Sequence, residues 1–512
     1  MTEDQKPTTP SARTSTASGA IEAKPASTSR PPEALPPVIE EPPAIGQDGD
    51  GGDTQVSPEQ AGAAPPPLPP PQPGRRVSRA HPAQEAPGDV TVPEDAVQRA
   101  MIPPPPKTLA ATGLSEGFLQ DLALKHVYFG GDLEGIAVAD RMALGFPLVE
   151  ELLHLLKRYE LIVAQGGSGI LRGARLRYRI TELGRKRIDE ILRRDNYCGP
   201  APVPYDQYVG QLSLQTVRQV HVPPERVHQA FDRLVLDPGI PYRIGPAIHS
   251  GRSLFLYGPP GNGKTSLAEC LVETIGGQVF IPRAVLVESE IVRVFDDLYH
   301  QAQQTDERYD ERWVLSRRPR VMVGGELSLE MLDLTVTGQA TWYEAPFQVK
   351  ANSGVLFIDD FGRQRCDPQE LLNRWIVPLE SGYDFLTFRN GQKVRIPFDT
   401  LVVFATNLDP KALVDEAFLR RIRYKIEVRD PSVPQYKKIW EQVCERHGIP
   451  YEESLVDYLL RKHYSAAHRP LRACHPRDLL EQVVDIARYR GHQPTLNREL
   501  LDHLCQLYFV EL

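Results

Sequence analysis

Short runs of consecutive apolar residues, each followed by polar residues, recur in the second half of the chain. Residues 254–257, 355–358 and 401–405 are such runs, and helical patterns lie between them. Runs of this length are typical of strands that are buried on both faces, as in parallel sheets. The pattern therefore predicts an α/β core with a central parallel sheet, and ligands of such sheets bind at the carboxyl ends of the strands.

The first apolar run leads directly into a glycine-rich loop. Residues 258–265 read GPPGNGKT, and the helix-compatible sequence SLAECLVETI follows. Glycines let successive backbone N–H groups turn toward phosphate oxygens, and the N-terminus of the next helix adds partial positive charge. We expect Lys264 to reach the β- and γ-phosphates and the Thr265 hydroxyl to ligate Mg²⁺. The expected nucleotide-binding residues are Gly258, Pro259, Pro260, Gly261, Asn262, Gly263, Lys264, Thr265 and Ser266.

Two carboxylates follow the second apolar run. Asp359 is expected to hold Mg²⁺ through water, and Asp360 to polarise the attacking water. Farther along, residues 384–388 and 393–397 flank an Asn-Gly turn, which is a strong hairpin signal. From about residue 430 the chain reads almost wholly as helices, for example at 436–447, 455–463 and 477–489.

The N-terminal part has a different composition. Residues 1–110 contain 24 of the 48 prolines and no aromatic residue, because the first one is Phe118. Such a segment buries too little apolar surface to offset its ordering entropy, so it is predicted to be disordered, with local polyproline II character. It serves either as a flexible leader or as a ligand for a proline-recognising partner.

Residues 113–195 have the pattern of a small folded domain. Helical spacing covers 114–128, 136–144 and 148–159, and strands are predicted at 161–164 and 176–180 on either side of the tip GGSGILRGA. Thr181 is a candidate cap of a last helix. Three helices followed by a hairpin is the order of a winged helix.

DNA binding and protein docking both remain open for this domain. Between residues 166 and 195, nine basic residues stand against four acidic ones, which favours contact with a duplex. Glu150 and Glu151, however, open the third helix, where winged helices usually contact bases and phosphates. Docking of a protein partner, self-association and a plain spacer are the alternatives.

Charge and composition bear on the expected partners and on the compartment of the protein. A net charge of −8 gives no general reason to expect nucleic acid or membrane partners. The six cysteines lack CxxC spacing, which suits free thiols in a reducing compartment. The chain has no signal-peptide pattern and no uncharged apolar run of about 18 residues. We therefore expect a cytoplasmic protein without membrane insertion.

The motifs together resemble those of the AAA+ ATPase superfamily. GPPGNGKT, FIDD, VFATN, AFLRR and HPRDLL occur in this order over residues 234–512. The segment from YEAPFQVKANSGVLFIDD through PFDTLVVFATN to DEAFLRRIRYKI is most similar to the MoxR-type, helix-2-insert branch. The resemblance implies a P-loop core with an all-helical lid, the cofactors ATP and Mg²⁺, and a ring, usually a hexamer, that acts on a protein client.

The resemblance also assigns roles to single residues. Asn407 matches the sensor 1 amide, which orients the attacking water or contacts the γ-phosphate. Arg421 lies where related proteins place an arginine finger that completes the neighbouring subunit's site, with Arg420 as the alternative, and Arg477 matches the sensor 2 arginine of the lid. Most hydrolysing relatives have glutamate at the position of Asp360, so turnover here is expected to be slow.

The organisation predicted from these features has five parts. They are a disordered tail (1–110), a winged-helix-like domain (111–195), a linker and lead-in helix (196–233), the ATPase core (234–430) and the helical lid (431–512). An insertion at about 285–350, with a helix over 288–300 and a strand-like segment near 321–332, is expected to project from the ring and contact the client, as insertions in this branch do.

Three functions fit this sequence. The first is an ATP-hydrolysing ring that remodels a protein or protein complex. The second is a DNA-associated regulator. Its assembly is switched by ATP, and its winged helix provides the specificity. The third is a nucleotide-gated scaffold that hydrolyses ATP weakly.

Overall fold

The computed structural model describes residues 101–165, 174–413 and 419–509. Most of the predicted tail, the glycine-rich tip at 166–173 and part of the arginine-bearing segment at 414–418 lie outside these residues. The last part of the predicted tail is described, and there the prediction of disorder is wrong. Leu109 is buried, and the Pro103 carbonyl accepts a hydrogen bond from the Asp310 N–H at 2.9 Å.

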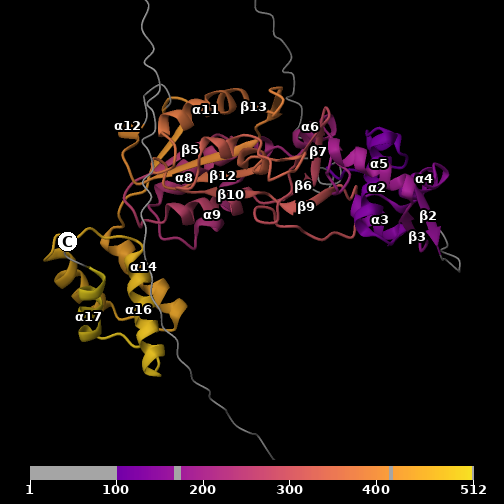
Figure 1. The fold of residues 1–512 in the computed structure, drawn as a ribbon. Coiled ribbons are helices and arrows are strands. Elements are labelled where there is room, and N and C mark those ends of the chain that lie inside the picture. The colour runs from indigo at the N-terminus through magenta and orange to yellow at the C-terminus, as the bar shows by residue number, and fades with distance from the viewer. Residues whose placement is uncertain (1–100, 166–173, 414–418, 510–512) are drawn as a thin grey trace, which may run out of the picture. The chain divides into compact units, whose positions relative to one another are not determined.

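A five-stranded parallel sheet forms the centre of the ATPase-like region, as predicted (Figure 1). Its order is β10-β12-β15-β5-β16. The strands are β5 (Leu254–Tyr257), β10 (Arg320–Val323), β12 (Gly354–Ile358), β15 (Thr400–Thr406) and β16 (Tyr424–Glu427). Because all five run in the same direction, the polar residues that follow β5, β12 and β15 meet at one edge of the sheet.

Helices cover both faces of this sheet. Alternate strand residues such as Leu256 and Phe357 share one buried cluster with residues of α7, α8 and α9. The intervening residues such as Phe255 and Phe404 share another cluster with residues of α11. The covering helices are α7 (Pro224–Phe231), α8 (Gly239–His249), α9 (Lys264–Ile275) and α11 (Pro368–Ser381), and the short helices α10 (Phe347–Lys350) and α12 (Pro410–Leu413) lie farther along the chain. Burial of both faces explains the uninterrupted apolar runs in the sequence.

The region inserted after α9 consists mainly of strands, so the predicted helix over residues 288–300 is wrong. The predicted strand-like segment near 321–332 is a strand only up to Val323, because Leu329–Leu332 form a 3₁₀ turn. Its strands are β6 (Gln278–Pro282), β7 (Ala284–Val287), β8 (Glu290–Arg293), β9 (Trp313–Arg317) and β11 (Tyr343–Glu344). β7 and β8 pair antiparallel with Val285 opposite Val292, and buried β-branched residues such as Ile291 favour a strand over a helix. Residues 320–323, which the sequence assigned to the insertion, form edge strand β10 of the central sheet, because Val321 and Val323 pack in its core.

The hairpin predicted before the third core strand is confirmed. β13 (Tyr383–Thr387) pairs antiparallel with β14 (Lys393–Pro397). Gly391 has a φ of +83° in the connecting turn, a backbone conformation that favours glycine.

Within the described residues of the segment 110–195, four α-helices accompany a three-stranded antiparallel sheet of order β1-β3-β2. Its elements are α2 (Glu116–Gly130), β1 (Leu133–Glu134), α3 (Gly135–Met142), α4 (Phe146–Arg158), β2 (Ile162–Gln165), β3 (Arg177–Ile180) and α5 (Glu182–Arg194), after a short 3₁₀ turn at Ala110–Thr112. Thr181 caps α5 by accepting a hydrogen bond from the Gly184 N–H, as predicted. Helical leucines pack against Ile162, Tyr178 and Ile180 of the sheet.

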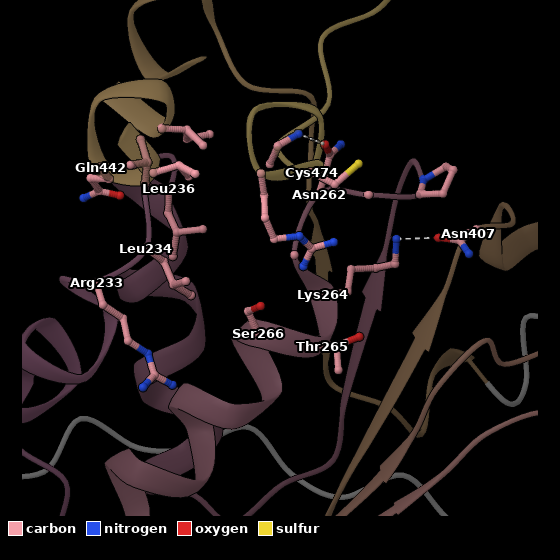
Figure 2. Close-up of a pocket in the computed structure, with 18 of the residues that line it drawn as sticks. Arg233, Leu234, Leu236, Asn262, Lys264, Thr265, Ser266, Asn407, Gln442 and Cys474 are labelled. Atoms are coloured by element: carbon pink, nitrogen blue, oxygen red, sulfur yellow. Dashed lines mark hydrogen bonds between the residues drawn. The ribbon is translucent and has the colours of Figure 1, made fainter. Parts of the chain in front are cut away.

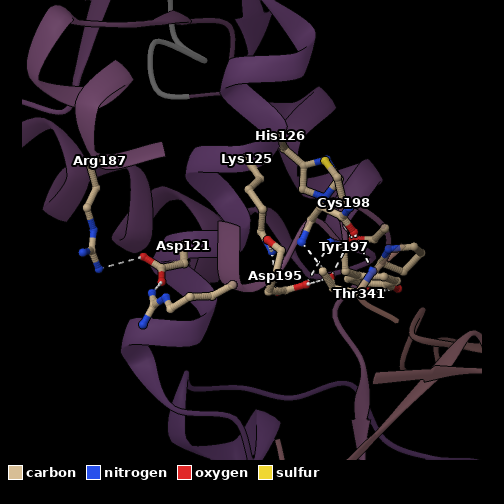
Figure 3. A network of polar contacts seen from close by, with 12 residues as sticks. Asp121, Lys125, His126, Arg187, Asp195, Tyr197, Cys198 and Thr341 are labelled. Carbon is tan, nitrogen blue, oxygen red and sulfur yellow. Dashed lines mark hydrogen bonds and ion pairs between the residues drawn. The ribbon is translucent and has the colours of Figure 1, made fainter. Parts of the chain in front are cut away.

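The following segment, expected to be a linker, packs against the inserted strands. It contains β4 (Val203–Pro204), which pairs with β7, then α6 (Tyr205–Leu214) and a 3₁₀ turn at Val217–Gln219. Figure 3 shows Asp195 and Thr341 in a polar network with Lys125, and the Thr341 N–H donates to Asn196 Oδ1 at 2.9 Å. Prolines in this segment therefore do not prevent it from packing.

The C-terminal region is helical, as predicted. It comprises α14 (Val433–His447), α15 (Glu453–Leu459), a π-helical turn at Leu460–Ser465, α16 (His475–Arg490) and α17 (Arg498–Tyr508). These helices share a core that includes Tyr436, Trp440 and Leu479. Within the described residues, no helix is both long and apolar enough to span a membrane.

Candidate functional site

A cavity of about 430 Å³ lies at the carboxyl edge of the central sheet, within the size range of small-molecule sites (Figure 2). The glycine loop, the ends of β12 and β15, the segment before α8 and residues of α14 and α16 line it. Of the predicted site residues, its lining includes Pro260, Gly261, Asn262, Gly263, Lys264, Thr265, Ser266, Asp359, Asp360, Asn407 and Arg477. The structure thus brings together most of the residues selected from the sequence.

The loop between β5 and α9 depends on glycine at three positions. Gly258, Gly261 and Gly263 have φ values of +132°, +79° and +80°. A Cβ atom at Gly258 would lie 2.3 Å from the Val428 carbonyl oxygen, and one at Gly261 would lie 2.6 Å from Cys474 Sγ. Larger residues at these positions are therefore strained, and the loop can approach a ligand with its backbone.

Lys264 is a buried cation without a carboxylate at ion-pair distance among the described residues. Its Nζ donates to the carbonyl oxygens of Gly258 and Pro259, both at 2.9 Å, and to Asn407 Oδ1 at 2.6 Å. Burial lowers the pKa of the Lys264 ammonium, and the charges of Asp359 and Asp360 oppose this effect. An anion in the cavity would favour the protonated form.

The two acidic residues after β12 have different contacts. Asp359 Oδ2 accepts a hydrogen bond from the Thr265 hydroxyl at 2.9 Å, so a hydroxyl and a carboxylate lie side by side. Asp360 Oδ1 accepts one from the Asn407 amide at 2.7 Å. Asp360 also has a φ of +46°, a conformation that costs about 1–3 kcal/mol for a residue other than glycine and is often retained at functional sites.

Gln364, which the sequence did not suggest, braces this acidic turn. Its amide nitrogen donates to the carbonyl oxygens of Asp359 at 3.0 Å and Asp360 at 3.2 Å. Its amide oxygen accepts from the Gly362 N–H at 2.7 Å. These contacts stabilise the left-handed backbone at Asp360.

The three predicted arginines have different positions. Arg477, in the first turn of α16, lines the cavity and donates to Asp478 Oδ1 at 2.9 Å; this hydrogen bond raises the pKa of the Arg477 guanidinium. Arg421 is not part of the lining and pairs with Glu380 at 2.5 Å. Arg420 is exposed and also absent from the lining. Only Arg477 therefore lies at this chain's own cavity.

The far side of the cavity was missed in the sequence. Its lining residues outside the recognised motifs are Arg233, Leu234, Val235, Leu236, Ile439, Gln442, Val443, Arg446, Ala473 and Cys474. Apolar side chains such as Leu236 and Val443 provide a surface for a flat apolar group, and Gln442 adds an amide beside them. The lining residues outside the motifs come from three segments, and the first lies more than 200 positions before the other two, so no local pattern marks them as one site.

Comparisons with known proteins find similarities in two parts of the chain. Residues 244–425 match a family model described as "Magnesium chelatase, subunit ChlI", and residues 432–507 match a domain of unknown function, DUF8689. No curated protein matches this chain. The ChlI match covers less than half of the chain and includes the glycine loop and most of the central sheet.

Solved structures give weaker similarities. The RuvB Holliday junction branch migration motor from Thermotoga maritima is 15% identical, with a TM-score of 0.31, and the match covers 58% of this chain and 74% of that one. NtrX from Brucella abortus in complex with ADP is 14% identical, with a TM-score of 0.32 and coverages of 62% and 58%. The predicted MoxR-type branch and winged helix stay predictions after these comparisons.

Proposed function

We propose that this chain binds ATP with Mg²⁺ in the cavity and hydrolyses ATP to ADP and phosphate. The observation that carries the proposal is the environment of Lys264. This buried ammonium contacts only neutral oxygen acceptors among the described residues, at the end of a loop whose backbone conformation suits phosphate binding. A triphosphate supplies the negative charge that this arrangement favours.

Thr265 and Asp359 are suited to hold Mg²⁺. A hydroxyl and a carboxylate oxygen are ligands that this cation prefers, and their 2.9 Å hydrogen bond keeps the two side by side in the cavity lining. The ion, when bound, would neutralise charge on the phosphate oxygens. Asp360 is then the residue that accepts a proton from the attacking water, and the Asn407 amide orients the Asp360 carboxylate.

We further propose that the chain acts as a ring, with six subunits as the expected number. Arg421 supports this part of the proposal, because it lies outside this chain's own cavity and is held by Glu380 near the surface. An arginine that completes a neighbour's site is worth about a thousandfold or more in turnover in related phosphoryl-transfer systems. Arg420 is the alternative donor of that charge.

Mixing two inactive variants tests hydrolysis and the shared site together. Lys264→Ala lacks a functional phosphate site but keeps Arg421, whereas Arg421→Ala keeps the phosphate site but lacks the arginine. Each variant alone should hydrolyse ATP at less than about one hundredth of the wild-type rate, and an equimolar mixture should recover a measurable part of it. Arg420→Ala is the matched control for the finger assignment. A mixture as inactive as its components would contradict the shared site.

For residues 111–195 we propose a winged-helix-like domain that docks a protein partner, the client or its adaptor, in a chain whose ATPase core is 234–430 and whose helical lid is 431–512. Much of its basic charge is internally paired. Asp132 pairs with Arg177 at 3.4 Å and Arg179 at 3.7 Å. Asp121 pairs with Arg187 and Arg194, both at 3.4 Å, and Figure 3 shows Asp121 facing Arg187. Paired arginines have less charge to offer to phosphates than the sequence count suggests.

The DNA-associated alternative has a direct test. If the domain contacts a duplex, the full chain should bind DNA with an affinity that falls steeply as salt rises, and Arg177→Ala should weaken that binding. We expect no binding to a random-sequence or promoter-derived duplex at about 150 mM salt. A salt-sensitive complex in the micromolar range would replace protein docking with DNA binding.

A further inference from the structure

The glycine loop is joined directly to the segment that begins α16. The Asn262 amide nitrogen donates to Asp430 Oδ1 at 2.7 Å, and its amide oxygen accepts from the Ala473 N–H at 3.1 Å. The Cys474 N–H donates to the Gly261 carbonyl oxygen at 2.8 Å. Two adjacent loop residues, Gly261 and Asn262, are therefore hydrogen-bonded to residues 473 and 474, more than 200 positions away in the sequence. Asn262 also contacts Asp430.

Both ends of the Asn262 amide are used in this connection. Asn262 is 5% exposed, and its partner Asp430 also pairs with Arg472, immediately before Ala473. Hydrogen bonds to a charged group are stronger than those between neutral groups. Aspartate at position 262 would lack the donor and would face the Asp430 carboxylate, so the contact requires an amide.

The joined segment leads into the helix that carries Arg477. α16 begins at His475, directly after Cys474, and Arg477 lies in its first turn facing the cavity. Asp478 holds the Arg477 guanidinium and in turn accepts a hydrogen bond from the Tyr508 hydroxyl at 2.6 Å. Because one turn of helix moves as a unit, the position of residues 473 and 474 determines where the backbone of Arg477 lies, and Asp478 holds its side chain.

We infer that Asn262 and Asp430 are positioning residues, which set Arg477 against the phosphate loop and transmit changes in that loop to the C-terminal helices. The inference rests on the proposed nucleotide site and adds to it a mechanical connection between the loop and α16. Asp430 does not line the cavity, and its partners are Asn262 and Arg472, so it acts on Arg477 indirectly and does not contact the ligand.

Two substitutions of Asp430 distinguish loss of its hydrogen bond with Asn262 from other effects of changing this residue. Asp430→Ala removes the acceptor, whereas Asp430→Asn keeps an oxygen that can accept from Asn262. In the full chain we expect Asp430→Ala to lower kcat for ATP about tenfold with a KM change below about threefold, and Asp430→Asn to stay within about threefold of wild type. Combined with Arg477→Ala, the Asp430→Ala change should add no further loss. Asn390→Ala, in the turn of the β13–β14 hairpin, is the control and should match wild type.

A second readout needs no hydrolysis. In the nucleotide-free protein, amide hydrogen exchange over residues 473–480 should rise at least about tenfold in Asp430→Ala and stay near the wild-type rate in Asp430→Asn. Unchanged exchange in Asp430→Ala overturns the inference, as do additive losses with Arg477→Ala or equal loss in both Asp430 variants. If instead the proposed function is wrong, wild-type hydrolysis is absent or is not reduced by Lys264→Ala. This result is distinct from every outcome of the Asp430 variants.

Discussion

Two lysines with almost the same burial, one in the cavity at the sheet edge and one in the inserted region, show how these two parts of the molecule differ. Lys264 is 7% exposed and Lys350 is 8% exposed. Lys350 Nζ pairs with Asp296 Oδ2 at 2.7 Å, whereas Lys264 Nζ contacts two backbone carbonyl oxygens and the amide of Asn407. Burial of a charge alone therefore does not mark a functional residue. The absence of a carboxylate partner among the described residues, beside an open cavity, is what distinguishes Lys264.

The inserted region contains a second buried charge that is paired within the protein, just before β9. Arg312 is 1% exposed and donates to both carboxylate oxygens of Asp310, with the shortest contact at 2.7 Å. It also donates to the Thr112 carbonyl oxygen at 2.8 Å. This pair joins the start of the N-terminal domain to the inserted strands and has structural rather than ligand-binding contacts.

The largest effect that we predict is on nucleotide affinity at Lys264. Lys264→Ala should weaken ATP binding by at least about a hundredfold, because the cation that we propose to face the phosphates is lost. Its melting temperature without nucleotide should stay close to that of wild type. Lys350→Ala is the matched control, with unchanged ATP affinity per folded molecule and lower stability. Titration calorimetry measures the ATP affinity, and thermal melting measures the stability. Unchanged ATP affinity in Lys264→Ala together with weaker ATP binding in Lys350→Ala would contradict the distinction between the two lysines.

The next largest effect is on the stability of the inserted strands. Arg312→Ala leaves the buried Asp310 carboxylate without its partner and should lower the free energy of unfolding by about 3–5 kcal/mol. Replacing both residues by leucine should recover most of this loss. Urea denaturation followed by circular dichroism measures it. A loss below about 1 kcal/mol would show that the Asp310–Arg312 pair does not stabilise the fold.

His475 is a buried polar group that is neutral rather than paired with an opposite charge. Burial lowers its pKa to about 4, and its Nδ1 contacts the Tyr464 hydroxyl at 2.9 Å. Below about pH 6.5 the unfolded chain binds a proton that folded His475 does not. Its contribution to stability is therefore complete above about pH 6.5 and lost as the pH falls toward about 4, by up to about 3 kcal/mol.

His475→Asn keeps an acceptor near the position of Nδ1 and cannot titrate. The free energy of unfolding of wild type should therefore fall relative to that of this variant between about pH 7 and about pH 4.5. Denaturation curves at both pH values measure the difference between the two proteins, and a difference that is independent of pH would contradict a depressed pKa at His475.

The smallest predicted effect concerns the length of one side chain. Asp360→Glu should raise turnover about two- to tenfold, since the longer side chain reaches farther toward the attacking water. Steady-state kinetics at saturating ATP measures the change, with KM expected to stay within about twofold. A lower rate would indicate that the left-handed backbone at Asp360 and its contact with Asn407 already place the shorter carboxylate for catalysis, and would weaken the scaffold alternative.

The sequence predicts the cavity side of the core better than the rest of the molecule. The glycine loop, the acids after β12 and the amide after β15 are each encoded within a few residues, because a strand end fixes where its next side chain lies. Their meeting at one sheet edge is confirmed by the contacts of Thr265 with Asp359 and of Asn407 with Asp360. The roles assigned to these residues stay predictions.

Features that depend on distant partners were not predictable in this way. The strand at Glu290–Arg293 forms because β7 and β11 pair with it, which local helical spacing does not reveal. Likewise, Leu236 and Val443 become one wall of the cavity only through packing of segments far apart in the chain. Gln364 has no motif at all, since its role is to hold backbone atoms of the acidic turn.

Steady-state ATP hydrolysis as a function of protein concentration, with wild type beside Lys264→Ala, tests the central claim most directly. If Lys264 binds the phosphates and Arg421 completes a neighbouring site, the wild-type rate per molecule rises with protein concentration and is lost in the variant. A wild-type rate equal to that of Lys264→Ala at every concentration would contradict the account of this cavity as an ATPase site.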